Sequence, residues 1–242
     1  THTVAASGAI TLITNGMASL NQNIKNNTFT NISCNTSGNF TFISNSISMI
    51  ATGTQDISSN QIVTGFSKTT AGGTVTVFST NGSSVNGSTA LNTGNNFSNI
   101  SLTGATAFIG WSNTDGSSTT SGPTKTITNN TFSNISTGSA SMTVISSNYG
   151  NNGTNVSNNT ISNISNVPTA TGLTLTGLSI GTSNGGATQT YSNNSISGLS
   201  STSTGCQVIG ILGGTVNVST INISGNTISG ISSTSTAGAV VA

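Results

Sequence analysis

Charge is what this chain has least of. Of its 242 residues only five are charged, and neither Arg nor Glu occurs. The five are Lys25, Lys68, Lys125, Asp56 and Asp115. An ordinary soluble domain is about a quarter charged, whereas this chain is 2% charged. Nucleic-acid binding and polybasic membrane patches both need clustered Lys or Arg, so we predict no nucleic-acid partner.

Long apolar runs and proline are also scarce. The longest unbroken apolar run is the four residues 239–242, while a transmembrane helix needs about 20. We therefore predict no membrane insertion. Only Pro123 and Pro168 are prolines, and disordered chains are typically rich in proline and charge. A long disordered segment is therefore not expected either.

Helix-forming residues are the third deficit. Ser, Thr and Asn fill most polar positions, and their side chains compete with the helix backbone for hydrogen bonds. No stretch combines helical apolar spacing with helix-favouring residues. The chain is therefore expected to be almost entirely β.

One six-residue pattern recurs along the chain. It consists of Asn, any residue, an apolar residue, two small or polar residues and a second apolar residue. The copy at Asn60 is degenerate, because Phe66 comes one place late, and Asn45 is interpreted as a half-period echo within one repeat. Clear copies begin at Asn27, Asn95, Asn130, Asn159, Asn194 and Asn226, and with Asn60 they are spaced 29 to 35 residues apart. Chance recurrence in an Asn-rich chain is disfavoured because the apolar positions keep their spacing too.

Two further alternating segments lie between successive copies. Residues 74–78, 142–145 and 173–180 alternate apolar and polar residues, and shorter stretches such as 125–128 and 188–191 lead into the Asn motif. Alternation with period two predicts strands. A single turn of three short strands cannot cover its own apolar side chains, but stacked turns can. We predict one β-solenoid domain over residues 1–242, with about seven rungs and three short strands per rung.

The Asn-x-Ile-x-x-Ile signature spans residues 27 to 231. In this respect the chain resembles the right-handed parallel β-helix family, the pectate-lyase-like solenoids and their non-enzymatic surface relatives. The resemblance implies a right-handed all-β solenoid in which an Asn at a tight turn stacks on its counterparts in a ladder of side-chain amides. Asn tolerates left-handed backbone angles, and its amide can both donate and accept hydrogen bonds. The matching positions are Asn27, Asn60, Asn95, Asn130, Asn159, Asn194 and Asn226.

The chemistry of that family is not matched by this chain. The resemblance implies enzymes that use clustered Asp, Arg or Lys, and lyases that bind calcium through several carboxylates. Here Asp56 and Asp115 stand 59 residues apart, and we expect both to be solvated loop carboxylates rather than a hydrolase pair. The single histidine, His2, lies in a terminal segment of a kind that often frays, which disfavours a Ser-His-Asp triad. We predict no enzyme, no catalytic residue, no cofactor and no metal site.

Cysteines and aromatic residues are expected to be structural. Cys34 and Cys206 should lie about five rungs, roughly 24 Å, apart, too far for a disulfide, which needs Cα atoms within about 7 Å. Both thiols are therefore expected to be free core fillers. Trp111, Tyr149 and Tyr191 are isolated in sequence, so core packing or single surface positions are favoured over a sugar-binding platform.

Glycosylation sequons are dense, as the composition alone requires. We expect the acceptors on loops, Asn81, Asn86 and Asn152, to be accessible if the host glycosylates surface proteins. No signal peptide is visible and the chain begins without Met. A trimmed fragment would explain this, but we favour a secreted product whose targeting segment has been removed, located outside the cell or on its surface.

The two ends carry small, apolar, β-compatible residues and no capping charges, over 3–13 and 237–242. Soluble solenoids usually protect their open ends. We therefore predict a self-assembling extracellular filament, sheath or stalk built by head-to-tail stacking. A cell-surface adhesin that binds glycans is the alternative. Ice binding is a third candidate, suggested by Thr74, Thr76, Thr174 and Thr176, although such Thr pairs do not recur at one fixed place in each rung.

Overall fold

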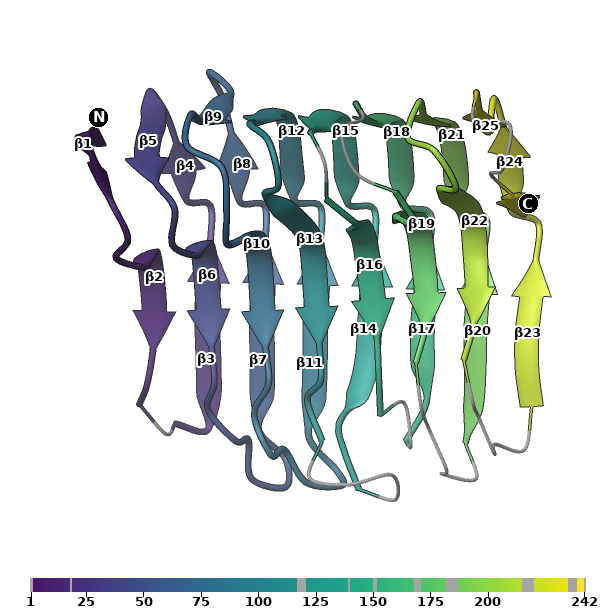
Figure 1. Cartoon of the computed structure of the whole chain (residues 1–242). Coiled ribbons are helices and arrows are strands. Elements are labelled where there is room, and N and C mark those ends of the chain that lie inside the picture. The colour runs from purple at the N-terminus through teal and green to yellow at the C-terminus, as the bar shows by residue number, and fades with distance from the viewer. Residues whose placement is uncertain are drawn as a thin grey trace.

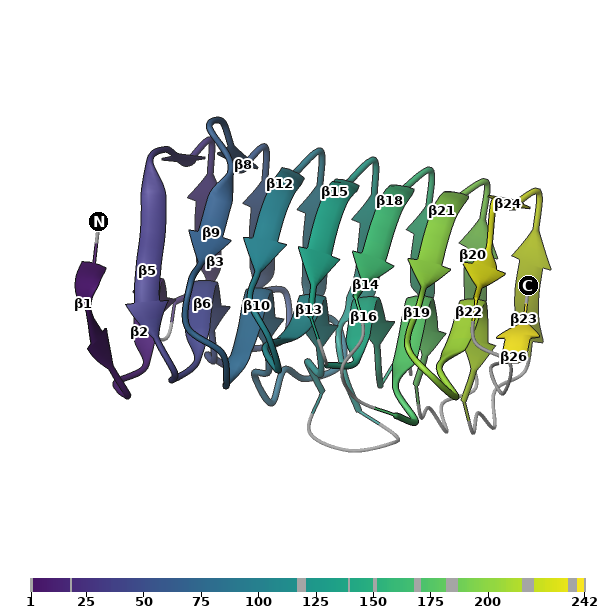
Figure 2. The ribbon, with the colours of Figure 1, turned by 45° about the horizontal axis from the view of Figure 1, so that its top comes forward.

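The computed structural model is a β-solenoid in which strands lie side by side from one end of the molecule to the other (Figures 1 and 2). It describes residues 2–17, 19–116, 121–138, 140–149, 152–167, 171–181, 187–214, 220–234 and 239–241. Every regular element within these ranges is a strand, and the strands pair in parallel. The all-β solenoid prediction is confirmed.

The strands form three sheets. Sheet A contains β1 (His2–Ala6), β4 (Thr28–Phe29), β5 (Ile32–Thr36), β8 (Gln61–Ile62), β9 (Phe66–Lys68), β12 (Asn96–Leu102), β15 (Thr131–Thr137), β18 (Thr160–Asn166), β21 (Ser195–Ser201), β24 (Thr227–Ser229) and β25 (Ser232–Ser233). Sheet B contains β2 (Ile10–Asn15), β6 (Phe40–Asn45), β10 (Thr74–Thr80), β13 (Ala107–Asn113), β16 (Met142–Ser147), β19 (Thr174–Ile180), β22 (Gln207–Gly213) and β26 (Ala239–Val241). Sheet C contains β3 (Asn21–Lys25), β7 (Thr54–Ser58), β11 (Thr89–Thr93), β14 (Thr124–Thr128), β17 (Thr154–Ser157), β20 (Thr188–Ser192) and β23 (Thr220–Ser224).

The chain visits sheets A, B and C in turn, and each visit lays a strand beside the one from the previous turn. Sheet C has seven strands and receives one per rung, so the described residues form seven three-sheet rungs, after which β24, β25 and β26 begin another. The prediction of about seven rungs with three short strands each is therefore confirmed. Figure 1 shows the two chain ends at opposite ends of the stack.

Equivalent residues of successive rungs lie in register. In sheet A, Phe97 pairs with Phe132 and Ile100 with Ile135. Inward side chains of all three sheets meet in one continuous hydrophobic core. The expected core placement holds for Trp111, which is 1% exposed, and for Tyr191, which is fully buried. Because equivalent apolar side chains of successive rungs stack on one another, each rung buries the apolar side chains of its neighbours.

The turn from sheet C to sheet A corrects one detail of the predicted backbone. The seven motif Asn residues are not left-handed; the residue immediately before each of them is. Gly94 and Gly225 fill that place in two rungs, and elsewhere it is filled by Asn26, Ser59, Asn129, Asn158 and Asn193. The left-handed residue turns the chain from sheet C into sheet A, and the Asn that follows it is buried in every rung except those of Asn27 and Asn226.

A second left-handed residue follows four places after most of the motif Asn residues and bends sheet A. It is Asn99 in β12 and Asn134 in β15, with φ of 61° and 54°. In the degenerate copy the equivalent residue is Gly65, five places after Asn60. That single extra residue accounts for the late Phe66.

Candidate functional site

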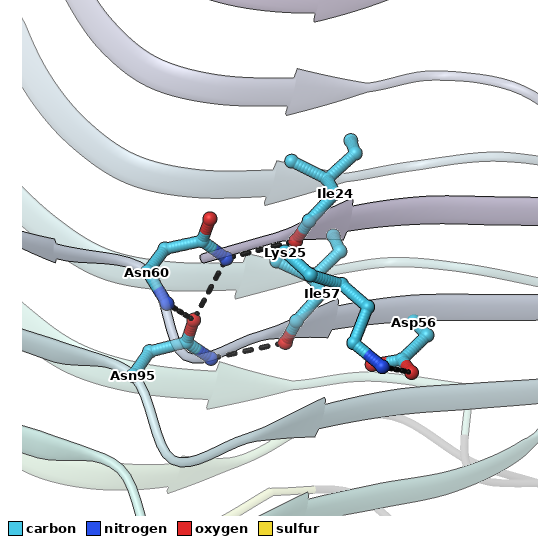
Figure 3. Close-up of polar contacts among 6 residues, drawn as sticks. All are labelled: Ile24, Lys25, Asp56, Ile57, Asn60 and Asn95. Atoms are coloured by element: carbon cyan, nitrogen blue, oxygen red, sulfur yellow. Dashed lines mark hydrogen bonds and ion pairs between the residues drawn. The ribbon is translucent and has the colours of Figure 1, made fainter. Parts of the chain in front are cut away.

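The seven motif Asn side chains lie in one file, each bonded to the next, and Figure 3 shows the link between Asn60 and Asn95. Asn60 Nδ2 donates to Asn95 Oδ1 at 2.9 Å, and Asn95 Nδ2 donates to Asn130 Oδ1 at 2.9 Å. The same contact, at 2.8 to 3.0 Å, joins the remaining pairs from Asn27 through Asn159 and Asn194 to Asn226. We call this file the inner Asn ladder.

Each interior amide of the inner Asn ladder has all its hydrogen-bonding groups satisfied. Asn60 Nδ2 also donates to the main-chain carbonyl of Ile24, and Asn95 Nδ2 to that of Ile57, as Figure 3 shows. Asn95 Oδ1 accepts a second bond from the main-chain N–H of Asn60. A fully bonded amide bears little desolvation cost when buried, so the ladder holds the turn together and leaves no group free for chemistry.

An outer file of Asn side chains was not predicted. Asn134 Nδ2 donates to Asn99 Oδ1 at 3.0 Å and Asn163 Nδ2 to Asn134 Oδ1 at 3.1 Å, both on the surface. These are the left-handed residues that bend sheet A. The recurring Ser-Asn-Ile within the six-residue motif was the sequence signal that could have indicated them.

Asp56 is not the solvated loop carboxylate that we expected. It lies in β7, and its Oδ2 is 2.7 Å from Lys25 Nζ of the neighbouring strand β3 (Figure 3). The lysine side chain is 41% exposed, so this ion pair contributes little stability, about 0 to 1 kcal/mol.

The expectation for Asp115 was also wrong, because its side chain is fully buried, as is that of Lys125. The Lys125 ammonium contacts Asn113 Oδ1 and the main-chain carbonyl of Asn148. Asn113 Nδ2 in turn donates to Asp115 Oδ2 at 3.4 Å. Burial, opposed by the Lys125 charge, raises the pKa of Asp115 to about 6, and burial, opposed by the Asp115 charge, lowers the pKa of Lys125 to about 7.

Lys68 is a second buried lysine that the sequence analysis did not place in the core. Its ammonium donates to the main-chain carbonyls of Thr70 and Gly72, both at 2.6 Å. Cys34 is its register partner in the next strand of sheet A. Burial lowers the pKa of Lys68 and raises the pKa of Cys34, and in each case the charge of the other opposes the shift.

Both cysteines are free and buried, as predicted. Among the described residues no group of three or more His, Cys, Asp or Glu side chains could hold a metal ion. His2 lies in β1, but its side chain is outside the described part of the structure. Over the same described ranges, no helix is long and apolar enough to cross a membrane.

The terminal rungs expose side chains that are buried one rung further in. Leu12 in β2 is 38% exposed, whereas Phe42, which takes the same place in β6, is fully buried. At the other end, Ile223 in β23 is 52% exposed, and its register partner Tyr191 is fully buried. Both ends of the stack therefore present inward-facing apolar side chains that no further rung covers within the described part of the chain.

The outer face of sheet B carries two columns of hydroxyl side chains. Thr76 and Thr176 occupy the same register position, but Ala107 and Ile109 take the places of Thr74 and Thr76 in the next rung, so the Thr pairs do not recur in every rung. The Thr column is Thr11, Thr41, Thr76, Thr143 and Thr176, with Ile109 between the third and fourth. Thr176 is only 2% exposed. The Ser column is Thr14, Ser44, Ser79, Ser112, Ser146 and Ser179.

The predicted glycosylation acceptors lie on the side of the solenoid where sheet B turns into sheet C. Asn81 and Asn86 are exposed, whereas Asn152 is half-buried. Asn152 Nδ2 donates to Asn86 Oδ1 at 2.7 Å and to the main-chain carbonyl of Gly122 at 2.5 Å. Sequon Asn residues in the left-handed turn positions, such as Asn129 and Asn158, are exposed as well.

No protein-family model, curated protein or solved structure matches this chain. The assignment of a parallel β-solenoid therefore rests on the chain's own geometry. The inner Asn ladder and the terminal rungs are the features from which a function can be argued.

Proposed function

We propose that this protein is a structural subunit of an extracellular filament, sheath or stalk, and that it assembles by stacking the end of one solenoid on the end of the next. It would then be a non-catalytic member of the parallel β-helix surface proteins that the Asn motif resembles. The observation that carries the proposal is the exposure of Leu12 and Ile223 at opposite ends, in positions that are buried within the stack. A second subunit docked on either end would supply the missing rung.

The backbone at both ends supports the same proposal. The strands β1, β2 and β3 at one end, and β23, β24 and β26 at the other, each lie last in the strand order of their sheet. Unpaired parallel edges are templates for further strands. Charged residues that would repel such pairing are rare in the whole chain. Burying each exposed apolar side chain would contribute about 1.5 to 3 kcal/mol, in addition to the main-chain hydrogen bonds.

The proposal is tested on the purified 242-residue chain by light scattering across a concentration series and by electron microscopy. We expect rods that lengthen with concentration. Leu12→Lys and Ile223→Lys should each stop growth, because each buries a charge at one docking end. Ser195→Lys, on an exposed side position of β21, is the matched control and should assemble normally. A chain that stays monomeric at high concentration would contradict the proposal.

A second candidate, ice binding, is favoured by the hydroxyl columns of sheet B. Parallel strands hold these columns at a constant spacing of about 4.8 Å along the stack, which gives a regular array of hydroxyl and methyl groups. Thermal hysteresis of the purified chain tests this candidate directly. Thr143→Lys in the Thr column should abolish the activity, whereas Thr126→Lys on sheet C should not. Absence of hysteresis in the unmodified chain would rule the candidate out.

A further inference from the structure

The buried cluster of Lys125, Asn113 and Asp115 lies at one corner of the solenoid. Asn113 ends β13 in sheet B, Asp115 follows two residues later, and Lys125 lies in β14 of sheet C in the same rung. All three side chains are at most 1% exposed. Neither proposed function uses this cluster.

The three side chains are arranged in the order that amide transfer requires. The Lys125 Nζ contacts Oδ1 of the Asn113 carboxamide, one bond from its carbonyl carbon. On the other side of the same carboxamide, Nδ2 donates to Asp115 Oδ2 at 3.4 Å. Asp115 is fixed in place by the main-chain N–H of Gly82, which donates to its Oδ1 at 2.9 Å. A nucleophile, an acyl group and a proton carrier beside the leaving nitrogen are thus held together in a buried site.

We propose that Lys125 and Asn113 join through an intramolecular amide bond, with release of one molecule of ammonia. The Nζ lone pair forms a bond to Cγ of Asn113, and the bond from Cγ to Nδ2 breaks. A proton from Nζ passes through the Asp115 carboxyl group to Nδ2, which leaves as ammonia. The atoms balance without any oxidant, metal or further reactant, because one primary carboxamide and one amine become one secondary amide.

The electrostatics of the site favour the reactive protonation states. Nucleophilic attack needs a neutral amine, and burial lowers the pKa of Lys125 to about 7. Proton delivery needs a protonated acid, and burial raises the pKa of Asp115 to about 6. Groups whose pKa values lie close to the ambient pH can supply both the neutral amine and the protonated acid. Moving the proton from the ammonium to the carboxylate also removes two charges from the low-dielectric interior.

The other two lysines provide internal controls. Lys68 is equally buried, but its ammonium bonds to main-chain carbonyls and to Thr106 Oγ1, which offer no carboxamide. Lys25 meets a carboxylate, but on the surface, where its side chain is 41% exposed and water competes. Only Lys125 combines burial, a side-chain amide and an acid.

The bond would staple sheet B to sheet C across the 113–125 segment. Such a cross-link restricts the unfolded chain, as a disulfide does, and it would survive the reducing conditions that break disulfides. In a filament under tension it would keep one rung closed while the rungs on either side open.

The experiment is mass spectrometry of the full, denatured chain, with and without tryptic digestion. We expect an intact mass lower than the sequence mass by one ammonia. Trypsin cleaves after lysine, so it should cut at Lys25 and Lys68 but not at a linked Lys125, leaving residues 69–242 in one piece with the ammonia loss in it. Lys125→Arg and Asn113→Ala should show the full mass of their own sequences. In Asp115→Ala, most chains should keep the full mass, because few of them form the bond.

Three results would overturn the proposal. An unchanged mass in the wild-type chain means that the lysine stays free, and this readout does not depend on whether any variant folds. Loss of water instead of ammonia means that Asp115, not Asn113, is the acyl group. Loss of ammonia with Lys125 still cleaved by trypsin means a cyclic imide at an Asn-Gly pair, such as Asn81-Gly82, and no cross-link.

Discussion

At the scale of single residues, the interior amides of the inner Asn ladder hold the turn between sheets C and A. Replacing Asn130 by Ala would remove its bonds to Asn159 Oδ1 and to the main-chain carbonyl of Asn92. It would also leave the main-chain N–H of Asn95 without its acceptor, the Asn130 Oδ1. Buried groups without a partner cost about 1 to 3 kcal/mol each, so we expect Asn130→Ala to lower the free energy of unfolding by at least about 2 kcal/mol, measured by chemical denaturation.

The matched control for this substitution is Asn134→Gly in the exposed outer file. Glycine keeps the left-handed backbone of Asn134, as Gly198 and Gly230 do in later rungs, and the lost hydrogen bonds face solvent. The expected loss is below about 1 kcal/mol. Equal losses at the two positions would show that the inner ladder has no special role.

Lys68 should make the stability depend on pH. Its pKa is lowered in the folded chain by burial, and it returns to about 10.4 on unfolding. Between these two values the unfolded chain binds a proton that the folded chain lacks, so the free energy of unfolding rises with pH in that window. In Lys68→Met this rise should be smaller, as measured by thermal unfolding from about pH 7 to about pH 10.

The comparison is made in a Cys34→Ala background. Burial raises the pKa of Cys34, and a raised thiol pKa would lower the stability as pH increases above about 8.5. With the thiol removed from both chains, the difference between their pH slopes reports Lys68, because Lys125, whose pKa burial lowers to about 7, is present in both. Identical pH slopes with and without Lys68 would contradict the expected sign.

At the scale of single elements, β13 carries a glycine where the core has no room for a side chain. A Cβ added at Gly110 would stand 2.4 Å from the carbonyl oxygen of Val144 and 2.9 Å from the Phe132 ring. We expect Gly110→Ala to destabilise the chain by about 1 to 3 kcal/mol through overpacking. At Gly213, the end of β22, an added Cβ would meet no atom within 4 Å, and Gly213→Ala should change stability by less than about 0.5 kcal/mol. Thermal unfolding of both variants tests the difference, and a harmless Gly110→Ala would mean that the sheets can move apart.

The strands also show what the sequence could and could not reveal. The period of the Asn motif and the alternation between its copies were enough to predict three strands per rung, because stacking requires each rung to repeat the same inward positions. The buried lysines were missed because charged side chains are almost never buried. Yet Lys125 shares the inward phase of Ile127 in β14, and Lys68 that of Phe66 in β9. The contact of Lys125 with Asn113 depends on how the corner folds, which alternation does not describe.

At the scale of the whole molecule, the stack is nearly one-dimensional, since each rung contacts mainly its two neighbours. Stability in such a chain is close to a sum over rungs and their interfaces. Removing one complete rung should therefore leave a shorter folded solenoid, provided that the register is kept. Asn95 and Asn130 are 35 residues apart, so deleting residues 95–129 places Asn130 after Gly94, where Asn95 was.

In that deletion the Asn60 amide would meet Asn130, and Phe132 would take the place of Phe97, its register partner. The deletion also removes Asn113, Asp115 and Lys125 together, so neither charge of the Lys125–Asp115 pair is left buried without the other. We expect cooperative unfolding with a slightly lower midpoint, and a rod shorter by about 4.8 Å.

Deleting residues 95–130 takes one residue more, which removes the ladder Asn and shifts the next strand of sheet A by one position. A one-residue shift turns the inward side chains of a strand outward, so this second chain should fail to fold, as circular dichroism and size-exclusion chromatography would show. If both deletions fold equally well, the stack is not held in register by the inner Asn ladder and the alternation of sheet A.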